Sequence, residues 1–168
     1  MMHQIRHARP ADHPAIAEII ERAFTDEFRQ STKADLVQRL REDGDVLFEL
    51  VAEAEGDLVG HILFSRLWAG NGQLYAALAP LAVRPGLQKA GLGSALTRAG
   101  LSHLGELGVR GVLVLGHPKY YPRFGFTAEA AAPVRSPYSG SPAFMALALE
   151  ADAFDEAFTV AYPAAFSA

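Results

Sequence analysis

The chain has 168 residues, of which half are hydrophobic and a fifth are charged, the composition of an ordinary globular domain. This length predicts one domain over residues 1–168, with a substantial core. The net charge of −4, without any run of Lys or Arg, argues against a nucleic-acid-binding surface.

The sequence predicts a cytoplasmic protein that needs no metal and enters no membrane. No apolar run approaches the roughly 18 residues of a transmembrane helix, and residues 1–9 are polar and basic, unlike a signal peptide. Cysteine is absent, which excludes disulfides, thiolate metal sites and a cysteine nucleophile. The six histidines are scattered along the chain, and we expect no metal site.

The first half of the chain carries alternating helix and strand patterns. Asp12 is a good N-cap for a helix with apolar residues at helical spacing, and Thr32 with Asp35 resembles a capping box for a second helix. Extended runs follow, two of them joined by a turn around Gly56. The expected elements are a strand at 5–9, helices over 12–24 and 32–44, and strands at 47–53, 58–67 and 74–83.

The second half predicts one long helix and further strands. Apolar residues stripe a helix over 92–107 that Gly108 ends, and the short apolar run 111–115 suits a buried central strand. We expect a brief helical turn at 119–124, a mobile loop over 127–142, and strands at 143–149 and 159–162. The order of elements predicts a mixed α/β (α+β) fold.

A polar, glycine-bearing loop leads directly from the strand at 74–83 into the long helix. Such a loop directs N–H groups outward at a helix N-terminus, where the dipole favours an anion, most naturally a phosphate. A Walker loop is excluded because Leu92-Gly93 stands where Lys-Ser/Thr is required. A dinucleotide fingerprint is disfavoured because Leu96 occupies the third glycine position. We therefore expect neither ATP nor NAD.

Two motifs in order resemble those of the GNAT superfamily of N-acetyltransferases. Gln88-x-x-Gly91-x-Gly93 resembles the superfamily's pyrophosphate-binding motif, Arg/Gln-x-x-Gly-x-Gly/Ala. Downstream, the string 121–126 resembles its Tyr-x-x-x-Gly-Phe element. The longer string 116–126, Gly-x-Pro-x-Tyr-Tyr-x-Arg-Phe-Gly-Phe, resembles one branch of predicted acetyltransferases. The resemblance extends from about residue 5 to residue 149, and to the end of the chain for that branch.

The resemblance implies the GNAT fold, a mixed central sheet of about six to seven strands flanked by helices. It implies an acyl-CoA-dependent N-acyltransferase that moves acetyl from acetyl-CoA directly to a small-molecule or peptide amine. The strand at 74–83 would diverge from that at 111–115, and the pantetheine arm would lie in the gap. The residues expected to bind the acyl donor are Leu81, Ala82, Val83, Gln88, Lys89, Ala90, Gly91, Leu92, Gly93 and Ser94.

Acyl transfer needs a neutral amine, a donor for the oxyanion and a proton for the departing thiolate. Without cysteine, direct attack by the acceptor is favoured over a covalent intermediate, with a strand N–H near Leu81 as oxyanion donor. A tyrosine is protonated at neutral pH, and the resemblance places Tyr121 as the acid that protonates the thiolate. Tyr120 is expected in the core with Phe124 and Phe126.

Several points stay open in the sequence. The general base is one of Glu27, Glu49 and His61 or a chain of waters. Val114 stands where many family members have an asparagine, and Pro122 limits the local helix to one turn unless it lies in the first turn. Tyr121 has an alternative role as an aromatic that only closes the cleft.

Other functions and assemblies also remain open. The alternatives to N-acyl transfer are a non-catalytic acyl-CoA-binding regulatory module and an O- or S-acyltransferase. The protein is expected to be a monomer or homodimer, and its acceptor to be selected by loops near 24–32, 67–73 and 127–142.

Overall fold

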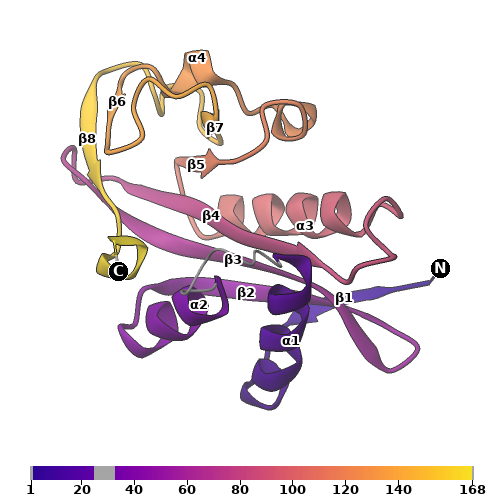
Figure 1. Ribbon diagram of the computed structural model, residues 1–168. Coiled ribbons are helices and arrows are strands. Elements are labelled where there is room, and N and C mark those ends of the chain that lie inside the picture. The colour runs from indigo at the N-terminus through magenta and orange to yellow at the C-terminus, as the bar shows by residue number, and fades with distance from the viewer. Residues whose placement is uncertain (1, 25–32, 168) are drawn as a thin grey trace.

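The computed structural model describes residues 2–24 and 33–167, and its centre is the hairpin that the sequence predicts (Figure 1). Glu55 and Gly56 join strands β2 (Val46–Ala54) and β3 (Asp57–Ala69) with positive φ angles of 53° and 84°. Positive φ at both positions is the backbone of a type I′ turn, whose twist matches antiparallel strands. A glycine turn then leads into β4 (Leu74–Val83).

The described residues form an eight-stranded sheet in the order β1-β2-β3-β4-β5-β7, with β8 pairing to β3 and β6. All pairings are antiparallel except β4 with β5 and β6 with β8. The remaining strands are β1 (Gln4–His7), β5 (Gly111–Leu115), β6 (Val134–Arg135), β7 (Phe144–Ala148) and β8 (Phe158–Ala161). The helices are α1 (His13–Ala23), α2 (Lys33–Glu42), α3 (Leu92–Glu106) and α4 (Ala128–Ala131).

Helices cover both faces of the sheet, with α3 on one face and α1 and α2 on the other (Figure 1). Leu96 of α3 is fully buried against the sheet, and Gly100 lets the ring of Phe64 approach the helix so closely that a Cβ would overlap it. Ile16, Ile20 and other apolar residues fill the opposite layer. Each such large side chain contributes about 1.5–3 kcal/mol by leaving water. No helix in the described ranges is long and apolar enough to cross a membrane.

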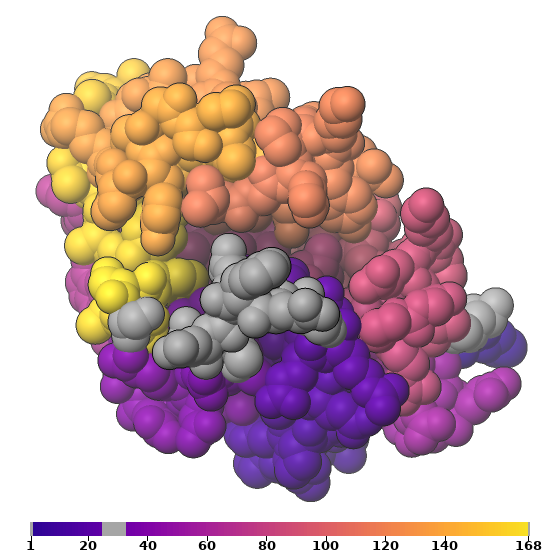
Figure 2. Space-filling view, in the orientation of Figure 1, coloured from indigo at the N-terminus to yellow at the C-terminus, as the bar shows by residue number. Residues whose placement is uncertain are grey.

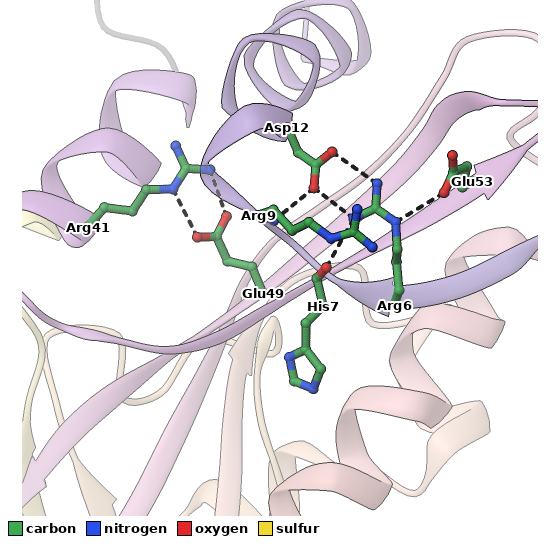
Figure 3. A network of polar contacts seen from close by, with 7 residues as sticks. All are labelled: Arg6, His7, Arg9, Asp12, Arg41, Glu49 and Glu53. Carbon is green, nitrogen blue, oxygen red and sulfur yellow. Dashed lines mark hydrogen bonds and ion pairs between the residues drawn. The ribbon is translucent and has the colours of Figure 1, made fainter.

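Two local predictions differ from the structure. Asp12 stands at the N-cap of α1, but its carboxylate accepts hydrogen bonds from Arg6 at 2.7 and 3.0 Å instead of capping the helix (Figure 3). The segment 127–142 is not one irregular loop: Thr127 accepts the N–H of Ala130 at 3.0 Å and so begins α4, and β6 follows. Thr32, the other predicted cap, lies outside the described residues.

Strands β4 and β5 are paired over a short length only. Tyr75–Leu78 lie beside 111–114, after which no further pairing joins the two strands in the described residues. On the other edge of β4, the register of its pairing with β3 shifts, so that Ala79 and Pro80 form a bulge. Proline cannot donate to a ladder, and bulges bend a strand away from its neighbour. β4 therefore diverges from β5, as the family resemblance predicts.

Candidate active site

The loop 84–91 ends in the N-terminus of α3. Gly91 is the N-cap residue with φ of +85°, a left-handed conformation that glycine adopts without strain. The helix then begins at Leu92, and in the described residues no side chain caps its first N–H groups. Unpaired N–H groups and the positive end of the helix dipole together favour an anion at this point.

Gly93 lies one residue inside the helix, where the chain is crowded. A Cβ at Gly93 would stand 3.1 Å from the hydroxyl of Tyr120 and 3.6 Å from Leu81. The hydroxyl of Tyr120 also lies 3.2 Å from Oγ of Ser94. The two predicted glycines therefore serve different needs, Gly91 the backbone turn and Gly93 the close approach of a tyrosine.

A cavity of about 810 Å³ lies between this helix start and the bulged end of β4. On the face drawn in Figure 2, the surface is recessed between the orange residues that follow β5 and the pink residues that lead into α3. Ala90 is the one predicted donor-binding residue that does not line the cavity. Those that do are Leu81, Ala82, Val83, Gln88, Lys89, Gly91, Leu92, Gly93 and Ser94, with Tyr121.

The lining of this cavity is positively charged although the whole chain has a net charge of −4. Lys33, Lys89 and Arg123 line it, and no carboxylate does so within the described residues. Arg123 is held in place, because its Nε donates to the carbonyl of Tyr120 at 2.8 Å and its guanidinium lies over that ring. Gln88 donates to the carbonyl of Val83 at 3.2 Å, which ties the loop to β4. The cavity suits a polyanionic ligand.

The two neighbouring tyrosines have different surroundings. Tyr121 is 8 % exposed and packs edge-on to Phe126, so burial raises the pKa of its hydroxyl and keeps the phenol protonated at neutral pH. Tyr120 is half-buried; its ring contacts Phe124 as expected, but its hydroxyl reaches Ser94 at the start of α3. Tyr120 is therefore more than a core residue. The sequence analysis did not predict the contact of its hydroxyl with Ser94.

Gly116 determines how the ring of Tyr121 lies. A Cβ added at Gly116 would overlap Cε2 of Tyr121 and stand 2.9 Å from Cδ2. Gly116 directly follows β5, and its missing side chain lets the ring of Tyr121 pack against the backbone at the point where β4 and β5 diverge. Pro122 stands in the first turn of the 3₁₀ helix Tyr121–Phe124, where proline is tolerated. That turn is the one predicted at 119–124.

Of the three predicted base candidates, Glu27 lies outside the described residues and the other two line neither cavity described here. Glu49 accepts two hydrogen bonds from Arg41 of α2, at 2.7 and 2.9 Å (Figure 3), and lies 2.8 Å from Nε2 of His61. Burial disfavours the ionised carboxylate of Glu49 and so raises its pKa. The hydrogen bonds from Arg41 and His61 outweigh this effect and hold the pKa of Glu49 at about 2. Burial lowers the pKa of His61.

His61 lies on the opposite side of the sheet from α3 because successive side chains of a strand alternate between its faces. Its neighbour Gly60 faces Leu96 of α3, so His61 faces the opposite layer with α1 and α2. Glu49 and His61 thus form a buried structural cluster.

A second cavity, of about 1250 Å³, adjoins the first. Leu78 and Ala79 at the bulge of β4, and Leu115 at the end of β5, line both cavities. The two spaces therefore meet where the two strands diverge. Of the three loops predicted to select the acceptor, 127–142 lines the second cavity through Tyr138, whereas no described residue of 67–73 does.

Residues 13–126 match the model of the acetyltransferase (GNAT) family. The chain belongs to the GNAT acetyltransferase family. It is 45 % identical over 121 residues to the uncharacterized N-acetyltransferase YjhQ of Escherichia coli K12, a match that covers 69 % of this chain and 65 % of that one. It thus spans slightly less than two thirds of that relative.

Two further GNAT proteins match over most of their length. The uncharacterized N-acetyltransferase YhbS of Escherichia coli K12 is 36 % identical over 139 residues, covering 82 % of this chain and 81 % of that one. The crystal structure of YhbS in complex with CoA superposes with a TM-score of 0.89, over 99 % of this chain and 92 % of that one. A GNAT acetyltransferase from Brucella melitensis, in complex with acetyl-CoA, has a TM-score of 0.82 and 34 % identity, covering 98 % of both chains.

These likenesses confirm the family, the mixed α/β fold and the class of activity that the two motifs predict, an acyl-CoA-dependent N-acetyltransferase. The roles of individual residues stay predictions. The geometry adds three residues that the sequence analysis did not single out: Gly116, Arg123 and the hydroxyl of Tyr120. Gly116 and Arg123 lie inside the quoted motif, so their positions were visible but their contacts were not.

Proposed function

We propose that the protein transfers an acetyl group from acetyl-CoA directly to an amine held in the second cavity. The observation that carries this proposal is the meeting of the two cavities at Leu78, Ala79 and Leu115. A donor in the first cavity and an acceptor in the second would have their reacting atoms side by side, with no residue needed to carry the acyl group between them.

The first cavity supports CoA as the donor. The pyrophosphate would receive N–H groups at the start of α3 and the charge of Lys89 and Arg123. The pantetheine arm would extend along the unpaired edge of β4, beside Leu81 and Val83. Similar GNAT structures hold CoA and acetyl-CoA.

The chemical step follows from these positions. The neutral amine attacks the thioester carbonyl, a C–N bond forms, and a strand N–H near Leu81 stabilises the oxyanion. The C–S bond then breaks, and Tyr121 donates its proton to the departing thiolate. Since Glu49 and His61 line neither cavity, a chain of waters is the proposed route for the proton lost by the amine.

An acceptor panel with acetyl-CoA and detection of free thiol tests the proposal. Amine-dependent release of CoA, with the acetylated amine found by mass spectrometry, is the expected result. CoA binding without turnover of any amine would favour a non-catalytic acyl-CoA-binding module, and acetylated alcohols or thiols would favour O- or S-acyl transfer. The cytoplasmic location and the monomeric or homodimeric state remain predictions from the sequence.

A further inference from the structure

Three aromatic rings lie together on one wall of the second cavity. Tyr138 comes from the segment after β6, whereas Tyr162 and Phe166 follow β8. The ring centroids of Tyr138 and Tyr162 are 5.1 Å apart at 88°, and those of Tyr162 and Phe166 are 5.4 Å apart at 75°. All three residues line the cavity. Edge-to-face rings at these distances present both faces and edges to a further ring placed beside them.

The hydroxyls of this wall are available to a ligand. Neither Tyr138 nor Tyr162 makes a side-chain hydrogen bond in the described part of the chain, although both are half-buried. Burial raises the pKa of Tyr162, so its phenol stays neutral and does not repel or attract a charge. The wall therefore offers apolar, planar surface with polar hydroxyl tips.

The charged residues described in the lining of the second cavity do not favour a strongly cationic acceptor. Among the described residues, this lining carries three carboxylates, Glu21, Asp35 and Glu42, and two cations, Lys33 and Arg39. Glu42 already accepts a hydrogen bond from Gln38 at 3.0 Å. A polyamine needs an excess of negative charge around it, and these signs nearly cancel.

We propose that the acceptor is a primary amine attached to an aromatic body, with its ring against Tyr138, Tyr162 and Phe166 and its amine at the junction of the two cavities. This inference rests on the proposed function, because it names the substrate class of the same site. The three rings are then specificity-determining residues, and segment 162–166 belongs to the acceptor site.

The rings also pack the C-terminal segment onto the rest of the domain, and the test must separate that role from recognition. The preference between two amines does so, because a merely structural loss would lower both rates together. The measured quantity is the ratio of kcat/KM for 2-phenylethylamine to kcat/KM for n-butylamine, with spermidine as a third acceptor. The KM for acetyl-CoA and the melting temperature are recorded for every variant.

We expect the wild-type ratio to favour 2-phenylethylamine, with spermidine a poor acceptor. Tyr138→Ala and Tyr162→Ala should each lower the ratio by about 3- to 10-fold, the effect of losing one good aromatic contact. Tyr138→Phe and Tyr162→Phe should retain the ratio because they keep the ring. Leu107→Ala removes an exposed apolar residue at the C-terminal end of α3 that lines neither cavity and is the matched control.

The outcomes distinguish the two proposals. Acetylation of n-butylamine or spermidine as efficiently as 2-phenylethylamine would overturn the aromatic preference and leave N-acetyl transfer intact. An unchanged ratio in both alanine variants would likewise assign the rings a packing role only. Turnover of no amine by a wild-type protein that binds CoA would overturn the proposed function and this inference with it.

Discussion

The ring of Tyr121 lies against the backbone of Gly116, with no room for a Cβ between them. Gly116 directly follows β5, and Tyr121 begins the 3₁₀ turn Tyr121–Phe124. The backbone of Gly116 therefore supports the ring that carries the Tyr121 hydroxyl, the proposed proton donor to the thiolate. Such a contact holds a ring more firmly than a neighbouring side chain would, because backbone cannot change rotamer.

Gly116→Ala tests this positioning. The added methyl must displace the ring, so we expect a loss of stability of about 1–3 kcal/mol and a fall in kcat with little change in the KM for acetyl-CoA. In a Tyr121→Phe background the same substitution should cost much less activity, since the hydroxyl it misplaces is already gone. Gly105→Ala, on the open side of α3, is the control. Equal losses of activity in both backgrounds would assign Gly116 to stability alone.

Tyr121→Phe removes only the proposed proton donor and keeps the buried ring. We expect the chemical step to slow by about 10²–10⁴-fold, with the deficit in kcat rather than KM. A single-turnover measurement is the appropriate comparison, because product release can limit the wild-type rate. Single-turnover rates equal to wild type would move the proton donor to Tyr120 or to solvent.

Tyr120→Phe is the companion variant. The hydroxyl of Tyr120 meets Ser94 at the start of α3, where the pyrophosphate is proposed to bind. We therefore expect its loss to raise the KM for acetyl-CoA by about 2- to 10-fold, the effect of one hydrogen bond. The single-turnover rate should stay nearly unchanged. A large fall in single-turnover rate would exchange the roles of the two tyrosines.

Gly93→Asp should abolish CoA binding while the fold survives. The new side chain would crowd the hydroxyl of Tyr120 and place negative charge where the pyrophosphate is proposed to bind. Stability should change little, because an acidic residue near a helix N-terminus is favourable. Melting curves with and without CoA measure the effect. Gly105→Asp, on the same helix but away from the cavity, should keep the rise in melting temperature that CoA induces. An undiminished rise in Gly93→Asp would show that CoA does not bind at the start of α3.

The buried cluster of Glu49 and His61 predicts sensitivity to acid. Both pKa values are lowered in the folded chain, from 6.5 for His61 and from 4.5 to about 2 for Glu49. The unfolded chain therefore binds more protons below about pH 6.5, and the free energy of unfolding falls as the pH drops through that value and again below 4.5. Melting temperatures from pH 8 down to about pH 2 at constant ionic strength measure this.

Glu49→Gln separates the two contributions. It leaves Arg41 without a charged partner, which should cost about 3 kcal/mol at pH 7, and it removes the decline below pH 4.5 while keeping the one near pH 6.5. Glu106→Gln, at an exposed carboxylate, is the matched control. A variant profile parallel to wild type below pH 4.5 would show that the acid sensitivity arises elsewhere.

Local patterns in the sequence predicted the parts of the site that depend on neighbouring residues. Gly91 ends a loop and starts a helix within one motif, and the hairpin at Gly56 needs only its own turn. The contact of Tyr120 with Ser94 joins residues 26 apart, and the rings of Tyr138 and Tyr162 come from the segments that follow β6 and β8. Such contacts depend on how the sheet folds the chain back, which periodicity does not encode.

The base candidates illustrate the same limit. Glu49 and His61 stand on central strands, where sequence alone does not tell which face a side chain occupies. One residue of register decides it, and the structure places both on the α1 and α2 side of the sheet, where they line neither cavity. A carboxylate beside a histidine, which in sequence suggests proton transfer, is in this fold part of the packing under α1 and α2.

The short pairing of β4 with β5 has a mechanical consequence. In the described residues, four pairs join the part of the sheet that contains β1–β4 to the part that contains β5 and β7, and β8 pairs with β3 at Trp68 and Ala69. The side chains of Phe158 and Val160 in β8 pack in the same core cluster as Leu113 of β5 and Phe144 of β7. Through its pairing with β3 and this packing, the segment 158–167 that carries Tyr162 and Phe166 connects the two parts of the sheet. Changes in that segment are therefore expected to affect both the rigidity of the proposed donor cleft and the proposed choice of acceptor.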